Sequence, residues 1–112
     1  MNAYEGIKTD NGAFLSPATV FAHEADHAVD DMTDAWRHSD RVKQKDSKYD
    51  NLEEKRVITG SEQITVRANG EIKTGRRSRN NHKGITIYTI SPTSNEYDAT
   101  ATKYFYKKHS RR

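Results

Sequence analysis

The chain has 112 residues, of which 32% are hydrophobic, and its mean hydropathy is −1.08. This length predicts one domain with a modest core, and the low apolar content favours an order that depends partly on something other than apolar burial, such as a bound metal. Because cysteine is absent, disulfides and thiolate metal ligands are excluded, and a metal would need His, Asp or Glu. The net charge of +3 is uneven: acidic residues gather in 24–34, basic residues in 73–83 and 103–112. No apolar run is long enough to predict a membrane span or a signal peptide.

The first predicted elements are a hairpin and a long helix. Asn11-Gly12 lies between two short apolar segments, which is typical of a hairpin turn. Ser16-Pro17 predicts an N-cap followed by the first helical residue. We expect this helix to run to about residue 36 or 37, with an apolar stripe at helical spacing that consists of Val20, Phe21, Ala28, Met32 and Ala35 or Trp36. Residues 38–50 show neither periodicity nor enough apolar content, and they predict a mobile polar connection.

The second half of the chain predicts another helix and a second hairpin. Asn51 and Glu54 have the spacing of a capping box, and apolar residues at helical spacing continue from there to Asn69-Gly70, although Gly60 weakens this helix. Residues 71–74 and 84–91 predict two strands that flank a basic loop, and 103–112 form a basic tail that contains a short aromatic patch. We therefore predict a small α+β domain over residues 1–112.

The letters HEADH in the first predicted helix have the spacing of a zinc hydrolase. His23 and His27 lie one turn apart on the same helix face, so both imidazoles can bind one ion. Glu24 is rotated by roughly 100° from His23, which places its carboxylate beside the ion as a general base for water rather than as a ligand.

A zinc site in a hydrolase needs a third protein ligand, and the second helix offers Glu53, Glu54 and Glu62. We prefer Glu54, then Glu53, because Glu54 projects toward the core with the apolar residues of that helix. The alternative is that Glu54 only completes the capping box. Asp30 or Asp31 could accept a proton from a ligand imidazole and fix its tautomer, or lie on a solvated face.

At this point the residues resemble a known family. "SPATVFAHEADHAVDD" followed by "NLEEKRVITGSE" looks like the zinc metallopeptidase domain of certain type III secreted effectors and of the C-terminal toxin ends of Rhs/YD-repeat polymorphic proteins. The string "HEADHAVDD" is also similar to the motif helix of the anthrax lethal factor class of toxin proteases. The resemblance implies that His23, His27 and Glu54 bind zinc and that Glu24 is the catalytic base. Asp26 departs from the usual motif, which carries a small or apolar residue before the second histidine.

The resemblance further implies peptide-bond hydrolysis inside a target cell, by a C-terminal fragment of a larger secreted or surface-bound parent. We thus expect a zincin-like metallopeptidase, monomeric and without a membrane partner, that acts on a protein or peptide. Two alternatives stay open: a non-catalytic, zinc-stabilised interaction module, and a basic nucleic-acid-binding or nuclease toxin domain. We expect Tyr49 to be structural, and the remaining histidines to be isolated surface residues, namely His38, His82 and His109.

Overall fold

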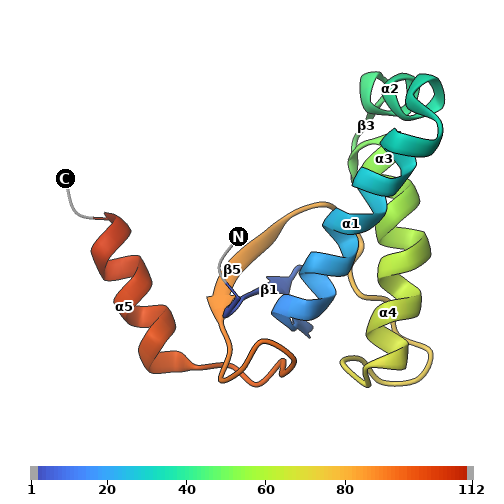
Figure 1. The fold of residues 1–112 in the computed structure, drawn as a ribbon. Coiled ribbons are helices and arrows are strands. Elements are labelled where there is room, and N and C mark those ends of the chain that lie inside the picture. Colours follow the sequence, from blue (N-terminus) through green and yellow to red (C-terminus); the bar gives the residue numbers. More distant parts are fainter. Residues whose placement is uncertain (1–2, 111–112) are drawn as a thin grey trace.

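The computed structural model describes residues 3–110, the last two by their backbone only. It confirms the predicted α+β class. A three-stranded antiparallel sheet in the order β2-β1-β5 lies beside two packed helical segments, and the C-terminal helix stands apart from them (Figure 1). Within the described residues, no helix combines the length and apolar character needed to span a bilayer.

The sheet begins with the predicted hairpin. Strand β1 (Glu5–Thr9) pairs antiparallel with β2 (Phe14–Leu15), and Gly12 in the turn has a φ of 78°, a value that glycine adopts without strain. Strand β5 (Gly84–Tyr88) pairs with the other edge of β1, Ile7 opposite Thr86. The predicted strand 71–74 and its hairpin with 84–91 are therefore wrong. The Glu71 side chain instead accepts hydrogen bonds at the start of the first helix, which holds this segment outside the sheet.

Helix α1 (Pro17–Thr33) starts as predicted, because the Ser16 side chain accepts a hydrogen bond from the Thr19 amide. It ends earlier than predicted. Asp34 leaves the helical conformation, and its carboxylate caps a separate helix α2 (Ala35–Lys43) by accepting from the Arg37 amide at 3.2 Å. The aspartate that we placed inside one long helix is the corner between two helices.

The predicted apolar stripe of α1 does not face the core. Phe21, Met32 and Trp36 are 63%, 85% and 89% exposed, whereas the buried residues of α1 include Thr19 and His23. The inward face of α1 is therefore polar, and carboxylates on the neighbouring helices hold it by hydrogen bonds. The buried apolar residues that form the core are Leu15, Tyr49, Val57, Ile58, Val66 and Ile87.

Residues 38–50, predicted as a mobile connection, are ordered. They contain the end of α2 and a minimal hairpin of β3 (Lys45–Asp46) and β4 (Asp50–Asn51). The Asp46 carboxylate accepts from the amides of Lys48 and Tyr49, both at 2.9 Å, and the Tyr49 ring is buried. Polar side chains order this segment, so apolar periodicity could not predict it.

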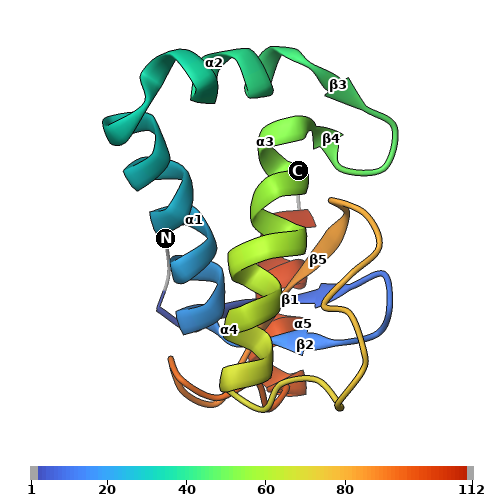
Figure 2. The ribbon, with the colours of Figure 1, turned by 90° about the vertical axis from the view of Figure 1, so that its right-hand side faces the viewer.

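The second predicted helix is a continuous helical rod with a wide turn in its middle. It comprises α3 (Leu52–Val57), the π-helical segment η1 (Ile58–Glu62) and α4 (Gln63–Ala68), and it packs alongside α1 (Figure 2). Asn51 caps it as predicted, since its Oδ1 accepts from the Glu54 amide at 2.9 Å. Gly60 lies within the π-helical segment, and no atom lies close to the position that its Cβ would occupy.

Helix α5 (Ala99–Ser110) replaces most of the predicted basic tail 103–112, whose last two residues lie outside the described part. The helix projects away from the rest of the molecule (Figure 1). Tyr106 anchors it by donating its hydroxyl to the Thr86 carbonyl at 2.6 Å, and the Phe105 ring lies 5.3 Å from the Tyr88 ring. The side chain of His109, predicted to lie at the surface, is outside the described ones.

Candidate metal centre

Three of the predicted site residues meet between α1 and the start of the rod. The Glu54 Oε1 atom lies 3.0 Å from His23 Nε2 and 2.5 Å from His27 Nε2, and the two Nε2 atoms are 3.0 Å apart. We call His23, His27 and Glu54 the histidine cluster. His23 is buried, and the other two side chains are half-buried.

Local sequence explains why these side chains meet. The four-residue spacing places both imidazoles on one face of α1. Asn51 starts the rod at a fixed residue, so that Glu54 projects from the first helical turn toward α1. Asn51 caps the Glu54 amide, yet the Glu54 carboxylate contacts the two imidazoles. The Glu54 carboxylate therefore contacts the imidazoles rather than only completing the capping box.

The π-helical segment brings Glu62 under the same face of the rod. Glu62 follows Glu54 by eight positions, which in a regular α-helix turns their side chains about 80° apart. The wide turn absorbs one extra residue, so Glu62 comes within about 20° of the direction of Glu54. Helical periodicity read from the sequence does not reveal this shift.

Glu62 fixes the tautomer of His23. His23 Nδ1 lies 2.9 Å from Glu62 Oε1, which also accepts from Arg79 Nη2 at 2.7 Å. The other carboxylate oxygen of Glu62 accepts from Ser78 Oγ at 2.6 Å. A carboxylate that serves these donors is an acceptor only, so His23 Nδ1 must donate. In the neutral ring, His23 Nε2 then carries a lone pair.

Glu53 does the same for His27. His27 Nδ1 lies 2.8 Å from Glu53 Oε2, which also accepts from Arg56 Nη2 at 2.9 Å, while Arg41 Nε donates to Oε1 at 2.8 Å. His27 Nδ1 is therefore a donor, and its Nε2 also presents a lone pair. Glu53 and Glu62, which the sequence left open as ligands, have their oxygens on the far edges of the imidazoles.

The electrostatics of the cluster favour a positive charge where the three atoms meet. Burial alone lowers the pKa of His23, but its hydrogen bonds to Glu54 and Glu62 outweigh burial and raise this pKa to about 9. Burial likewise opposes the ionisation of Glu54, but hydrogen bonds to the two histidines hold its pKa well below its usual range. Two nitrogen lone pairs and a carboxylate oxygen repel one another unless a proton or a metal ion lies between them.

The donor set fits zinc. Two neutral imidazoles and one carboxylate are the ligands that catalytic zinc sites use. A tetrahedral ion with bonds of about 2.0–2.1 Å would hold its ligand atoms about 3.4 Å apart, so the three atoms need to separate by less than about 1 Å. Among the described side chains, His23, His27 and Glu54 are the possible ligands whose atoms come together at this point.

A pocket of about 180 Å³ opens on the histidine cluster. Glu24 lines it together with His23 and Glu54, and the Glu24 side chain is exposed on α1. His82 also lines the pocket; its Nδ1 donates to the Lys48 carbonyl at 3.0 Å, which fixes the ring. His82 is exposed, as predicted for a surface residue, but no sequence pattern indicated that it lines the same pocket as Glu24.

A second group of possible ligands lies next to the first. His38 Nδ1 is 2.9 Å from Asp30 Oδ2 and 3.5 Å from Glu53 Oε2, so the expectation that His38 is isolated is wrong. Arg41 and Arg56 occupy this group: Arg41 contacts both carboxylates, and Arg56 contacts Glu53. We call Asp30, His38 and Glu53 with these two arginines the arginine cluster. Asp30 thus serves His38 and Arg41 rather than His27.

Two further acidic residues of α1 lie outside the histidine cluster. Asp31, predicted as a possible partner of a ligand imidazole, is exposed on α1. Asp26 accepts from Arg56 Nη2 at 2.8 Å and from the Ser61 hydroxyl. The extra carboxylate of the motif therefore ties α1 to the rod.

Comparison with known proteins found no matching family model, no matching curated protein and no matching solved structure. The similarity to toxin-associated metallopeptidases therefore rests on the residues of the motif helix and of the rod, and family membership stays a hypothesis.

Proposed function

We propose that this chain is a zinc-dependent hydrolase in which His23, His27 and Glu54 bind the metal. One observation carries the proposal: two imidazole nitrogens whose lone pairs are fixed by Glu62 and Glu53 meet a third acceptor within 3.0 Å. The described residues contribute three ligand atoms at this point. A site with three protein ligands and an open position is typical of catalytic rather than structural zinc.

We further propose that the reaction is hydrolysis of a peptide bond. Zinc bound at this site supplies a Lewis acid that polarises a carbonyl and makes water nucleophilic near neutral pH. Glu24 lies at the mouth of the pocket, where its carboxylate can take a proton from water and return it to the leaving amine. Glu53 and Glu62 hold the ligand imidazoles in the tautomer that exposes Nε2. A protein or peptide substrate and delivery by a larger parent are part of the same proposal and rest on the motif resemblance.

The test is zinc content by mass spectrometry together with proteolysis of an unstructured protein substrate. We expect about one zinc per wild-type chain, little zinc in His23→Ala, and retained zinc with lost proteolysis in Glu24→Gln. His38→Ala is the matched control, because it removes a histidine that lies outside the histidine cluster. An absence of stoichiometric zinc in unchelated wild-type protein would contradict the proposal. Zinc in Glu24→Gln with unchanged proteolysis would contradict the role of Glu24.

A further inference from the structure

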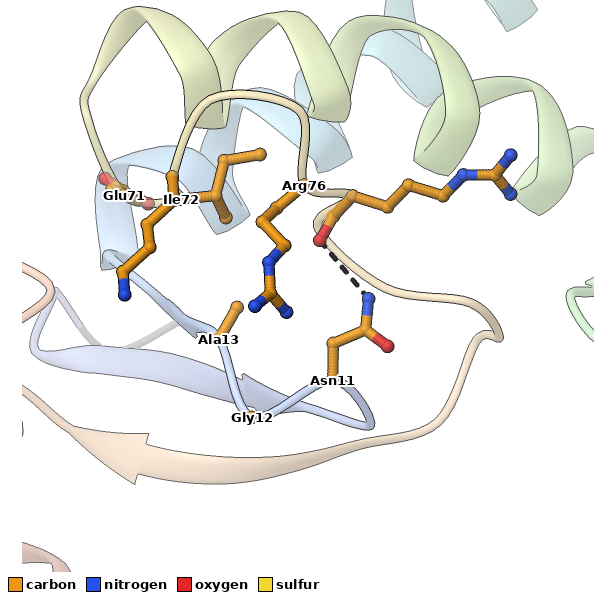
Figure 3. Close-up of a pocket in the computed structure, with 8 residues that line it drawn as sticks. Asn11, Gly12, Ala13, Glu71, Ile72 and Arg76 are labelled. Atoms are coloured by element: carbon orange, nitrogen blue, oxygen red, sulfur yellow. Dashed lines mark hydrogen bonds between the residues drawn. The ribbon is translucent and has the colours of Figure 1, made fainter.

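A second hollow lies between the β1–β2 hairpin and the loop that follows α4. It shares no lining residue with the pocket at the metal centre. It has a volume of about 340 Å³, and the hairpin lines it with Asn11 and Gly12 while the loop contributes Lys73, Arg76 and Arg77. Figure 3 shows the Arg76 side chain pointing from the loop toward Asn11 and Ala13. We call this hollow the basic pocket.

The backbone around the basic pocket is fixed although it contains no regular secondary structure. Asn11 Nδ2 donates to the Arg77 carbonyl at 3.2 Å, as the dashed line in Figure 3 marks. On the other side, Gln63 Nε2 of α4 donates to the Arg76 carbonyl at 2.7 Å. The Arg76 amide closes a turn on the Lys73 carbonyl at 3.0 Å. The loop is thus attached both to the hairpin and to the rod, which fixes the backbone that carries the three cationic residues.

The charges in the basic pocket are not neutralised within the described part of the chain. Lys73, Arg76 and Arg77 are exposed and form none of its ion pairs, whereas Arg79, two residues further on, is buried against Glu62. Like charges brought together in a hollow repel one another unless an anion screens them.

Glu71 is the one carboxylate in the lining, and it is already engaged. Its Oε1 accepts from the Ser16 amide and the Thr19 hydroxyl at 3.0 and 2.9 Å, and its Oε2 accepts from the Ser16 hydroxyl at 2.6 Å. These donors belong to the first turn of α1, where the helix dipole also stabilises a negative charge. Glu71 therefore keeps its negative charge, and the lining as a whole, with three cations and one anion, carries a net charge of +2.

We propose that the basic pocket binds a phosphate group. The Arg76 guanidinium, which points into the hollow, and the Lys73 ammonium can hold its oxygens with charge-assisted hydrogen bonds. Gly12 lines the hairpin side of the hollow without a side chain. The group could be free or attached to a serine side chain. None of the residues that carry this inference belongs to the metal centre, so it stands independently of the proposed hydrolase function.

The test is a titration of the full chain with inorganic phosphate at constant ionic strength, followed by amide NMR. We expect saturable shifts at the amides of Gly12, Ala13 and Arg76, which line the pocket. We also expect about tenfold weaker binding for Arg76→Gln and for Lys73→Gln, as loss of one charge-assisted hydrogen bond predicts. Lys43→Gln at the exposed end of α2 removes the same charge elsewhere and should leave the affinity unchanged. A parallel titration with phosphoserine amide distinguishes the two sources of the phosphate group. Tighter binding of inorganic phosphate indicates a free phosphate, and tighter binding of phosphoserine amide indicates a phosphorylated side chain.

Two outcomes would overturn the proposal. One is equal weakening by Arg76→Gln and Lys43→Gln, which would mean that only net charge matters. The other is a set of shifts centred on His23 and His27, which would place the phosphate on the metal. Lys73 and Arg76 are both exposed, so their substitution should leave the fold intact. Circular dichroism of each variant verifies that a loss of binding is not a loss of fold.

Discussion

The histidine cluster and the arginine cluster use the same ligand types and lie side by side, yet they differ in how their charge is balanced. Arg41 and Arg56 contact the carboxylates of the arginine cluster directly. In the histidine cluster, the ion pairs that Glu54 forms within the described residues are with the two histidines alone. Residue types and short distances therefore do not by themselves define a metal site. The histidine cluster is the better candidate because its negative charge still lacks a permanent cation.

The two clusters are also connected through Glu53. This carboxylate belongs to the arginine cluster, and its Oε2 accepts from His27 Nδ1. The arginines of one cluster thus help to keep Glu53 ionised and so orient an imidazole of the other. Burial raises the pKa of Glu53, but hydrogen bonds to Arg56, Arg41 and His27 outweigh burial and lower it to about 2. The comparison separates the group that we propose as the metal site from the group that orients one of its imidazoles.

The largest expected effect is loss of the buried arginine behind the histidine cluster. Arg79 and Glu62 are 6% and 2% exposed, so Arg79→Leu leaves a buried carboxylate without its guanidinium partner. We expect the free energy of unfolding to fall by about 3–5 kcal/mol, measured by urea denaturation. Arg56→Leu in the arginine cluster should cost only about 1 kcal/mol, because Arg56 is partly exposed and Glu53 keeps Arg41. The reverse order would contradict the view that the histidine cluster is the more deeply buried network.

The second effect concerns zinc affinity. Glu53→Gln replaces the ionised acceptor of His27 Nδ1 with a neutral amide, so we expect zinc to bind about 10–100-fold more weakly, measured by competition with a chromophoric chelator. His38→Ala should leave affinity and stoichiometry unchanged, because its partners are Asp30 and Glu53 rather than the shared ligand point. Loss of one zinc equivalent in His38→Ala would instead assign a metal to the arginine cluster.

The third effect is the pH dependence of the metal-free protein. The raised pKa of His23 contributes stability that is fully present below the ordinary value of 6.5 and is lost as pH rises through about 9. The lowered pKa of Glu54 contributes stability that is present above 4.5 and is lost as pH falls. We therefore expect stability in chelator, followed by urea denaturation, to be greatest between about pH 4.5 and 6.5. A flat profile from pH 6.5 to 9 that His23→Gln leaves unaltered would contradict a cation requirement in the histidine cluster.

Local signals in the sequence predicted the parts of the fold that depend on neighbouring residues. The Asn11-Gly12 turn, the Ser16 cap and the Asn51 cap each require residues within a few positions, and all three are in the structure. The partner of β5 is β1, nearly eighty residues away along the chain, and no local pattern encodes that pairing. The inward face of α1 was also missed, because polar side chains rather than apolar ones determine it.

The candidate site was predictable to the same degree. The spacing of His23 and His27 predicted the shared face of the two imidazoles, and the apolar face of the second helix was enough to prefer Glu54 over its neighbours. The positions of Glu62, Arg79 and His38 were not predictable, because they depend on a π-helical turn and on charges from distant segments. Carboxylate–arginine pairs follow no sequence periodicity. A segment without an apolar pattern can therefore still form an ordered network of ion pairs.

The smallest expected effect concerns Asp26, the residue that departs from the motif of the resembled family. Burial raises its pKa, but hydrogen bonds from Ser61 and Arg56 outweigh burial and lower it, so the carboxylate links α1 to the rod. Asp26→Asn keeps the shape and removes the charge. We expect it to cost about 0.5–1 kcal/mol of unfolding free energy and to leave zinc affinity unchanged. A drop in zinc affinity comparable to that of Glu53→Gln would mean that Asp26 acts through Arg56 and Glu53 on His27, and the boundary between the two clusters would then have to include it.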